Sequence, residues 1–205
     1  MDAAADVGVT ARKTRARSSP ARGAMRERLC EAAARIFVAE GEAALSMRRL
    51  AAEVGCSPMA PYRHFADKHA LLAAIAAREL ARQADNLAGS AAGDVREMMR
   101  GYVRWALRYP ERFRLTFGRW EREDAGLGAA AGGARAALVR AVTGAQARGE
   151  LPRGDPERLS ALLLALAHGA ADQALAGHLS ATGKGAADAE DLVADLFAYL
   201  RASVR

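Results

Sequence analysis

The segment Ser46–Leu72 reads SMRRLAAEVGCSPMAPYRHFADKHALL and decides the fold. Ser46 is a good N-cap, because its hydroxyl can accept a hydrogen bond from an otherwise unpaired amide of the first helical turn. Gly55 suits the end of the short helix that follows, since a left-handed backbone costs glycine least. Ser57 can cap a second short helix that runs to about Phe65, with Pro58 at its first position, where a missing N–H is no loss. The segment therefore predicts two short helices joined by a turn, a helix-turn-helix.

Longer helical patterns flank this segment on both sides. Before it, Leu29 and Ile36 lie on one face of a helix that ends near Gly41. After it, Asp67 can cap a long helix that carries Leu71 and further apolar residues at helical spacing.

The rest of the chain is rich in Ala, Leu and Arg and poor in β-branched and aromatic residues, which favours helix over strand. Stretches rich in Gly or Pro divide it into helical segments at roughly 94–109, 111–120, 134–148, 156–178 and 189–203. The Gly/Ala stretch 125–134 is predicted to be a loop. We therefore expect an all-α protein of about nine helices.

The net charge of +6 is concentrated near the amino end. Residues 1–78 hold 13 Lys/Arg against 8 Asp/Glu, whereas the remaining residues hold 17 against 16. A local basic excess suits a polyanionic partner, either a nucleic acid or an anionic membrane surface. A solvated basic face would have the same composition, so charge alone does not decide.

Several classes of protein do not fit the sequence. Cys30 and Cys56 lack the spacing of a zinc site or a disulfide framework, and the longest apolar stretch, Ala161–Ala167, is too short to cross a bilayer. No apolar segment follows the basic amino end as a signal peptide requires. None of the four histidines has a catalytic spacing, and no phosphate-binding glycine motif is present. We expect a cytoplasmic protein, not an enzyme, with no cofactor, metal or membrane partner.

The end of the opening segment resembles a known family. A glycine turn, a serine, then Tyr62-x-His64-Phe65, an acidic residue and Lys68 are similar to the motif of the TetR family of bacterial repressors. The match covers residues 25–72, with most motif positions filled. The resemblance implies that residues 24–70 form a helix-turn-helix DNA-binding domain and residues 71–205 a helical regulatory and dimerisation domain. Residues 1–23, basic and without apolar periodicity, are predicted to be a disordered tail.

Three residues of the motif suit contact with the DNA backbone. Tyr62 and His64 can donate hydrogen bonds to phosphate oxygens, and Lys68 adds a full charge near the start of a helix. Such contacts position the protein without reading sequence. Tyr62 could instead be a core aromatic, and His64 could cap or pack; for Phe65 the core is the better reading.

Residues close to this motif are expected to contact the DNA bases and so to recognise the operator sequence. Arg48 could hold a guanine through two hydrogen bonds, and the resemblance selects it over Arg49. Met59, Ala60 and Pro61 offer apolar surface suited to a thymine methyl. Pro61 also removes an early intrahelical hydrogen bond, which predicts a loosely wound recognition helix. The expected DNA-binding residues are Ser46, Arg48, Ser57, Pro58, Met59, Ala60, Tyr62, His64 and Lys68.

The carboxyl-terminal part resembles a TetR subgroup. Tyr102–Leu107 followed by Pro110–Gly118 is similar to its helix that ends at a proline and continues as F-R-L-x-F-G. His168-Gly169 fits the subgroup's Trp-x-x-x-His-Gly signature, although Leu164 stands in place of the tryptophan. Met and aromatic side chains between the DNA-binding domain and the dimer helices could line a small-molecule pocket, because pockets in helical proteins use such residues with a few polar anchors. Its candidate residues are Met98, Trp105, Phe113, Phe117, Trp120, His168 and Asp172; a plain core is the alternative.

Self-association is the third expectation. The stretch Ser160–Ala171 is apolar on every side, and such a helix has to be buried all round. Pairing with a symmetry mate would bury it, together with the last helix, in a four-helix bundle. The expected interface residues are Leu162, Leu166, Ala170, Leu192, Leu196 and Leu200; a monomeric core is the alternative.

The function these features favour is a dimeric repressor that binds a palindromic double-stranded operator and is released by a small-molecule effector. A DNA-binding module without a ligand is the second hypothesis, and it predicts a filled core around Trp105. An enzyme is the third and least favoured.

Overall fold

The computed structural model describes residues 20–89, 94–118, 120, 122–180, 182, 185 and 187–202. Within these ranges the protein has eight α-helices, two short 3₁₀ helices and no strand, so the predicted all-α class is confirmed. The eight α-helices are close to the nine expected. Residues 1–19 of the predicted tail lie outside the described residues, whereas Pro20–Gly23 form the first turn of α1.

The amino-terminal helices surround one core. These elements are α1 (Pro20–Glu40), η1 (Glu42–Ala44), α2 (Met47–Val54), η2 (Pro61–Arg63) and the start of α3 (Lys68–Gly89). Leu29, Leu50 and Leu71, one from each α-helix, are fully buried at its centre. Phe65 is also buried there, as expected, and the guanidinium of Arg26 lies 5.0 Å from the centre of its ring.

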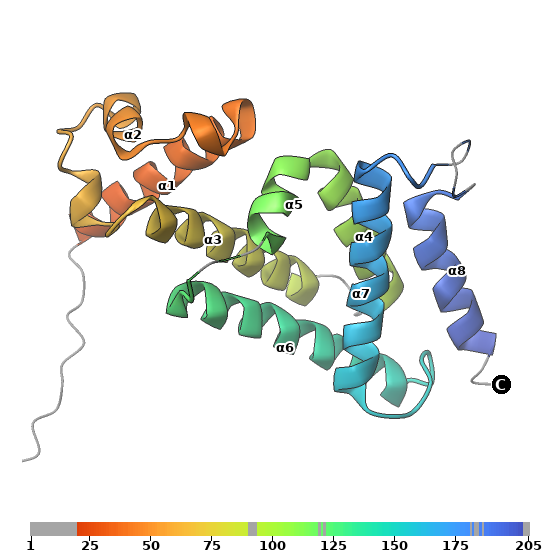
Figure 1. Ribbon diagram of the computed structural model, residues 1–205. Coiled ribbons are helices and arrows are strands. Elements are labelled where there is room, and N and C mark those ends of the chain that lie inside the picture. Colours follow the sequence, from red (N-terminus) through yellow and green to blue (C-terminus); the bar gives the residue numbers. More distant parts are fainter. Residues whose placement is uncertain are drawn as a thin grey trace, which may run out of the picture.

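Helix α3 connects this unit to the rest of the molecule (Figure 1). Arg78 pairs with Glu27 of α1 at 2.9 Å, while the next residue, Glu79, is buried on the side of the carboxyl-terminal helices. Leu115, from α5, packs into the amino-terminal core. The two parts of the chain are therefore joined by one shared helix and by side chains packed across the boundary.

The carboxyl-terminal body consists of α4 (Val95–Arg108), α5 (Pro110–Phe117), α6 (Ala125–Ala147), α7 (Pro156–Leu175) and α8 (Ala189–Ala202). Asp94, Asp124 and Asp155 cap α4, α6 and α7 through their side chains, and a proline opens α5 and α7. Val103, Val142 and Val193 lie in a second core shared by α4, α6, α7 and α8. Helix α6 lies along α3, and α7 and α8 lie on the side away from the amino-terminal unit (Figure 1).

The prediction of a loop at 125–134 is wrong, because these residues form the first half of α6. Asp124 accepts the amide hydrogen of Leu127 at 2.8 Å, and alanine offsets part of the cost of the glycines. Helix α6 also packs along α3 and buries Leu138 and Val142, so tertiary packing sustains a helix that local composition disfavours.

No helix in the described ranges has the length and hydropathy to cross a membrane. Over the same ranges, no group of three or more His, Cys, Asp or Glu residues could hold a metal ion.

Candidate DNA interface, cavity and dimer face

The helix-turn-helix begins with the local geometry that its residues predict. The Ser46 hydroxyl accepts the amide hydrogen of Arg49 at 3.2 Å, and α2 buries Met47, Leu50 and Ala51. Gly55 ends the helix with φ +70° and ψ +42°, the left-handed conformation that glycine adopts at little cost. The direction of the chain into the next segment is set by this turn.

The second element is shorter than expected. The chain forms turns at 58–60 and a 3₁₀ helix at Pro61–Arg63, not an α-helix from Pro58 to Phe65. Pro61 has no N–H to donate, which explains why the helix does not wind regularly through it. Pro61 is also fully buried, so the expected thymine contact at this residue is wrong, while the amide of Phe65 donates to its carbonyl at 2.9 Å.

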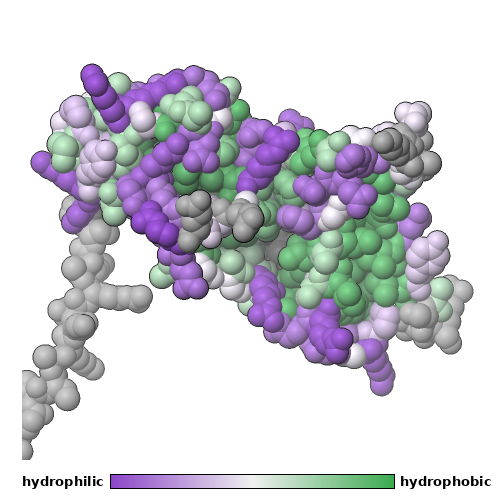
Figure 2. Space-filling view, viewed as in Figure 1, coloured by the Kyte–Doolittle hydropathy of each residue, from purple (hydrophilic) through white to green (hydrophobic). Residues whose placement is uncertain are grey.

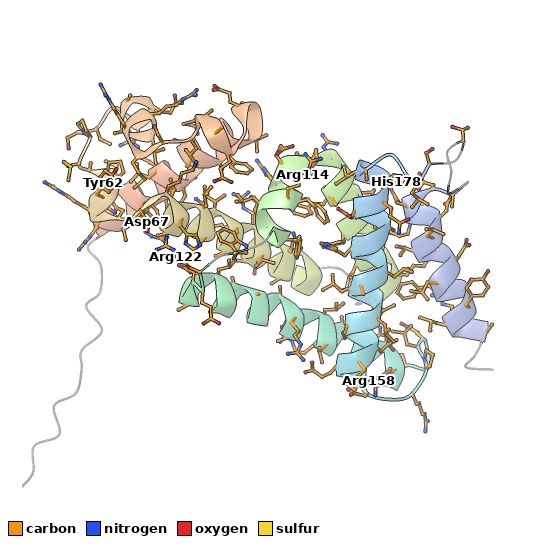
Figure 3. All side chains as sticks on the ribbon, viewed as in Figure 1. Tyr62, Asp67, Arg114, Arg122, Arg158 and His178 are labelled. Atoms are coloured by element: carbon orange, nitrogen blue, oxygen red, sulfur yellow. The ribbon has the colours of Figure 1, made fainter. Side chains whose placement is uncertain are left out.

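The residues expected to contact DNA lie together at one end of the molecule, where Figure 3 places Tyr62. Met59 and Tyr62 are 64% and 48% exposed, although large apolar or aromatic side chains are usually covered. Ser46, Arg48, Ser57 and Pro58 are exposed as well, and Ala60, His64 and Lys68 are half-buried.

The two adjacent arginines of α2 have different surroundings. Arg49 forms two hydrogen bonds to the Glu40 carboxylate and is held against the body of the protein. Arg48 is exposed and has no ion-pair partner among the described residues. Of the two, Arg48 is the side chain that remains available to a DNA base.

The Lys68 ammonium is already partly engaged. It donates to the backbone carbonyl of Glu42 at 2.7 Å and lies 3.5 Å from the Glu42 carboxylate. An ammonium has three donors, so this arrangement orients Lys68 and leaves donors for a phosphate.

Residues 58–63, which take the place of the expected recognition helix, are called the recognition turn below. Sequence reasoning missed a group of cationic side chains around it. Arg22 donates to the carbonyl of Arg63 at 3.1 Å, and Arg26 lies over the ring of Phe65. Burial, followed by the charges of Arg22, Arg26 and Arg63, holds the pKa of His64 below its usual value. Arg22 and Arg26 are four residues apart, a spacing that places both on one helix face and could have pointed to this group.

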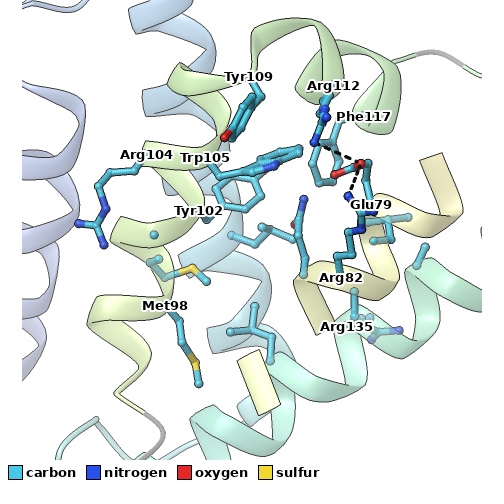
Figure 4. Close-up of a pocket in the computed structure, with 18 of the residues that line it drawn as sticks. Glu79, Arg82, Met98, Tyr102, Arg104, Trp105, Tyr109, Arg112, Phe117 and Arg135 are labelled. Carbon is cyan, nitrogen blue, oxygen red and sulfur yellow. Dashed lines mark ion pairs between the residues drawn. The ribbon is translucent and has the colours of Figure 1, made fainter. Parts of the chain in front are cut away.

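A cavity of about 570 Å³ lies between α3, α4, α5, α6 and α7, and its size is typical of small-molecule sites. Of the predicted pocket residues, Met98, Trp105 and Phe117 line it (Figure 4). Its other apolar or aromatic lining residues include Met99, Tyr102, Leu138 and Leu164.

The other four predicted pocket residues lie elsewhere. Phe113 is buried behind Tyr102, and His168 Nδ1 lies 2.9 Å from the Tyr102 hydroxyl, so both support the wall of the cavity. Trp120 packs edge-on against His69, with 5.4 Å between ring centres, and Asp172 is exposed. Burial also raises the pKa of Tyr102, so its hydroxyl stays protonated.

The polar side of the cavity was not anticipated. Glu79, Arg82 and Gln83 come from α3, and Arg112 comes from α5. The spacing i, i+3, i+4 on α3 is the signal that could have found the three α3 residues.

The outer face of α7 and α8 carries exposed apolar side chains. Leu162 is 66% exposed, Leu166 36% and Tyr199 73%. Figure 2 shows apolar surface over this part of the molecule. Among the expected interface residues, Ala170 is instead buried in the second core, and Leu192, Leu196 and Leu200 are partly buried against it.

A helix-turn-helix on a helical body that contains a cavity is typical of a DNA-binding regulator. Residues 29–75 match the model for bacterial regulatory proteins of the tetR family, and residues 95–200 match the model for a tetracyclin repressor-like C-terminal domain. The chain therefore belongs to the TetR family of DNA-binding transcriptional regulators.

Solved structures of other proteins share this fold. A protein of unknown function from Rhodococcus sp. RHA1 is 28% identical, with a TM-score of 0.73 over 94% of this chain and 98% of that one. A TetR-family transcriptional regulator from Pectobacterium atrosepticum is 25% identical, with a TM-score of 0.62 over 92% and 96%. A TetR/AcrR-family regulator from Thermobifida fusca, 20% identical, shares the fold with a TM-score of 0.63 over 89% and 99%. No curated protein matches the sequence.

Proposed function

We propose that this chain is a repressor that binds a palindromic operator as a homodimer and is released when a small molecule occupies the cavity. The observation that carries the proposal is the course of α3. This helix begins directly after the recognition turn and continues into the cavity wall, where it contributes Glu79, Leu80, Arg82 and Gln83.

Four contacts support α3 as the element that couples the two sites. Arg78 holds α3 to α1 through Glu27 and Glu31, one residue before Glu79 in the cavity wall. Near the start of α3, Asp67 accepts the amide hydrogen of Ala70 and pairs with Arg122 at 2.8 Å (Figure 3). A ligand that shifts α3 would therefore also shift the recognition turn.

Release from DNA follows from the thermodynamic linkage between ligand binding and DNA binding. A ligand that binds more tightly to the conformation with wrongly spaced recognition turns lowers DNA affinity by the same factor. The cavity beside Trp105 favours this scheme over a DNA-binding module without a ligand, which requires a filled core there.

The dimer is supported by the exposed apolar face. Leu162, Leu166 and Tyr199 present apolar area on adjacent helices, and a two-fold axis through this face would pair α7 and α8 with their symmetry mates. Such a dimer would present two recognition turns to two half-sites.

Fluorescence anisotropy with duplexes from the DNA flanking the protein's own gene tests this function. We expect saturation at two chains per specific duplex and affinity about a thousandfold above that for scrambled DNA. Compounds that raise the unfolding temperature are then added to the complex, and at least one should release it. Equal affinity for scrambled DNA, or binders that all leave operator affinity unchanged, would contradict the proposal.

A further inference from the structure

The polar side of the cavity holds more positive than negative charge. Glu79, with its side chain 7% exposed, lies 3.5 Å from Arg82 Nη1 and 3.7 Å from Arg112 Nη1, and Figure 4 shows the three side chains converging. Both distances exceed that of an ordinary charged hydrogen bond. Two guanidinium groups therefore share one carboxylate without close contact to it.

The other charged lining residues are engaged outside this group. Arg104 forms ion pairs with Glu97 and Glu190, and Arg135 pairs with Glu157. The excess of one positive charge therefore belongs to Arg82 and Arg112.

Two hydrogen-bond donors beside the cavity are unsatisfied. Over the residues the structure describes, Nε of Arg112 and the side-chain amide nitrogen of Gln83 are buried without a hydrogen-bond partner. A buried donor without an acceptor is costly, so a ligand that brings an acceptor gains from both groups. What this end of the cavity lacks is an anionic acceptor.

Apart from Glu97, Arg104 and Arg135, the other walls of the cavity are apolar. Met98, Tyr102 and Trp105 from α4, Leu138 from α6 and Leu164 from α7 surround a volume large enough for an extended hydrocarbon or a ring system.

We propose that the cavity takes a carboxylic acid with an apolar body, its carboxylate bound by Arg82 and Arg112 and its body against Trp105 and Met98. A carboxylate carries the single charge that balances the excess, whereas a phosphate monoester carries about two charges at neutral pH. The planar guanidinium fork also matches a carboxylate. This assignment rests on the proposed function, because it names the effector class of the same cavity.

Calorimetric titration of the full-length protein, without DNA, with decanoate, 1-decanol and decyltrimethylammonium tests the assignment. The three probes share one chain and differ in head-group charge. We expect decanoate to bind about tenfold more tightly than 1-decanol and decyltrimethylammonium to bind most weakly. Equal or weaker binding of decanoate relative to either probe, or no binding of decanoate, would overturn the proposal.

Substitutions locate the head group. Arg112→Met should weaken decanoate about tenfold and leave 1-decanol nearly unchanged. Arg114→Met, which removes an exposed arginine from the same helix, should change neither. If Arg112→Met does not fold by circular dichroism, Arg82→Met carries the same expectation. Loss of affinity for decanoate and 1-decanol alike would contradict the assigned contact.

Glu79→Gln separates an anion site from a cation site. Removing the internal carboxylate frees both guanidiniums, so decanoate should bind several-fold more tightly. Tighter binding of decyltrimethylammonium instead would overturn the proposal. Different results would contradict the two proposals. Decanoate that binds without affecting operator affinity contradicts release by a ligand. Release of the operator only by uncharged compounds contradicts the assignment of a carboxylic acid but leaves release by a ligand standing.

Discussion

Replacing Leu162 with alanine tests the proposed dimer face quantitatively. Fully burying a leucine side chain contributes about 1.5–3 kcal/mol. Leu162 is 66% exposed in the single chain, so most of that contribution, about 1–2 kcal/mol, is available to a partner. A two-fold axis repeats the contact, which gives about 2–4 kcal/mol per dimer and a dissociation constant about 30- to 1000-fold higher.

Analytical ultracentrifugation over a range of protein concentrations measures that constant. Val38→Ala is the matched control, because Val38 is 40% exposed but lies on α1 in the amino-terminal unit. It should leave the dimer unchanged, and circular dichroism should show the same helix content for both variants. A dimer affected no more by Leu162→Ala than by Val38→Ala would refute the assignment of this face.

Three further results are expected. Gly55→Ala should destabilise the protein by about 1 kcal/mol in urea unfolding, because alanine is strained at φ +70°; Gly55→Asn should lose less, since asparagine tolerates that conformation. Leu163→Ala should cost about 2–5 kcal/mol by the same measurement, because this side chain is 1% exposed in the second core. The pKa of His64 is lowered in the free protein, and a bound phosphate would raise it, so DNA binding should take up a proton. Operator affinity should then rise as pH falls from about 8 to about 6, and His64→Gln should abolish that rise.

The sequence was most informative where one residue type determines a local conformation. Ser46, Gly55 and Asp67 each occupy the capping or turn position expected, because a side-chain acceptor or a left-handed backbone is needed there whatever the rest of the fold does. The buried leucines of α1, α2 and α3 follow from helical spacing for the same reason.

The sequence was least informative where contacts between residues far apart in the chain determine the structure. The glycines of 125–134 predict a loop locally, but packing along α3 holds them in a helix. The Met and aromatic residues of the carboxyl-terminal part indicated a pocket, yet which rings face it depends on how α5 turns: Phe113 lies behind the wall and Phe117 lies in it. The charged side from α3 and α5 arises only when the two helices meet.

We infer that the capped helix-turn-helix binds duplex DNA, with Arg48 reading the base sequence and Lys68 holding the phosphate backbone. The salt dependence of operator affinity, measured for Lys68→Gln, Arg48→Ala and the unchanged protein, tests this inference. Lys68→Gln should weaken binding to all duplexes and flatten the plot of log affinity against log salt by about one unit. Arg48→Ala should remove about 1–3 kcal/mol of preference at a single base pair. Identical behaviour of the two variants, or affinity unchanged in both, would contradict the claim.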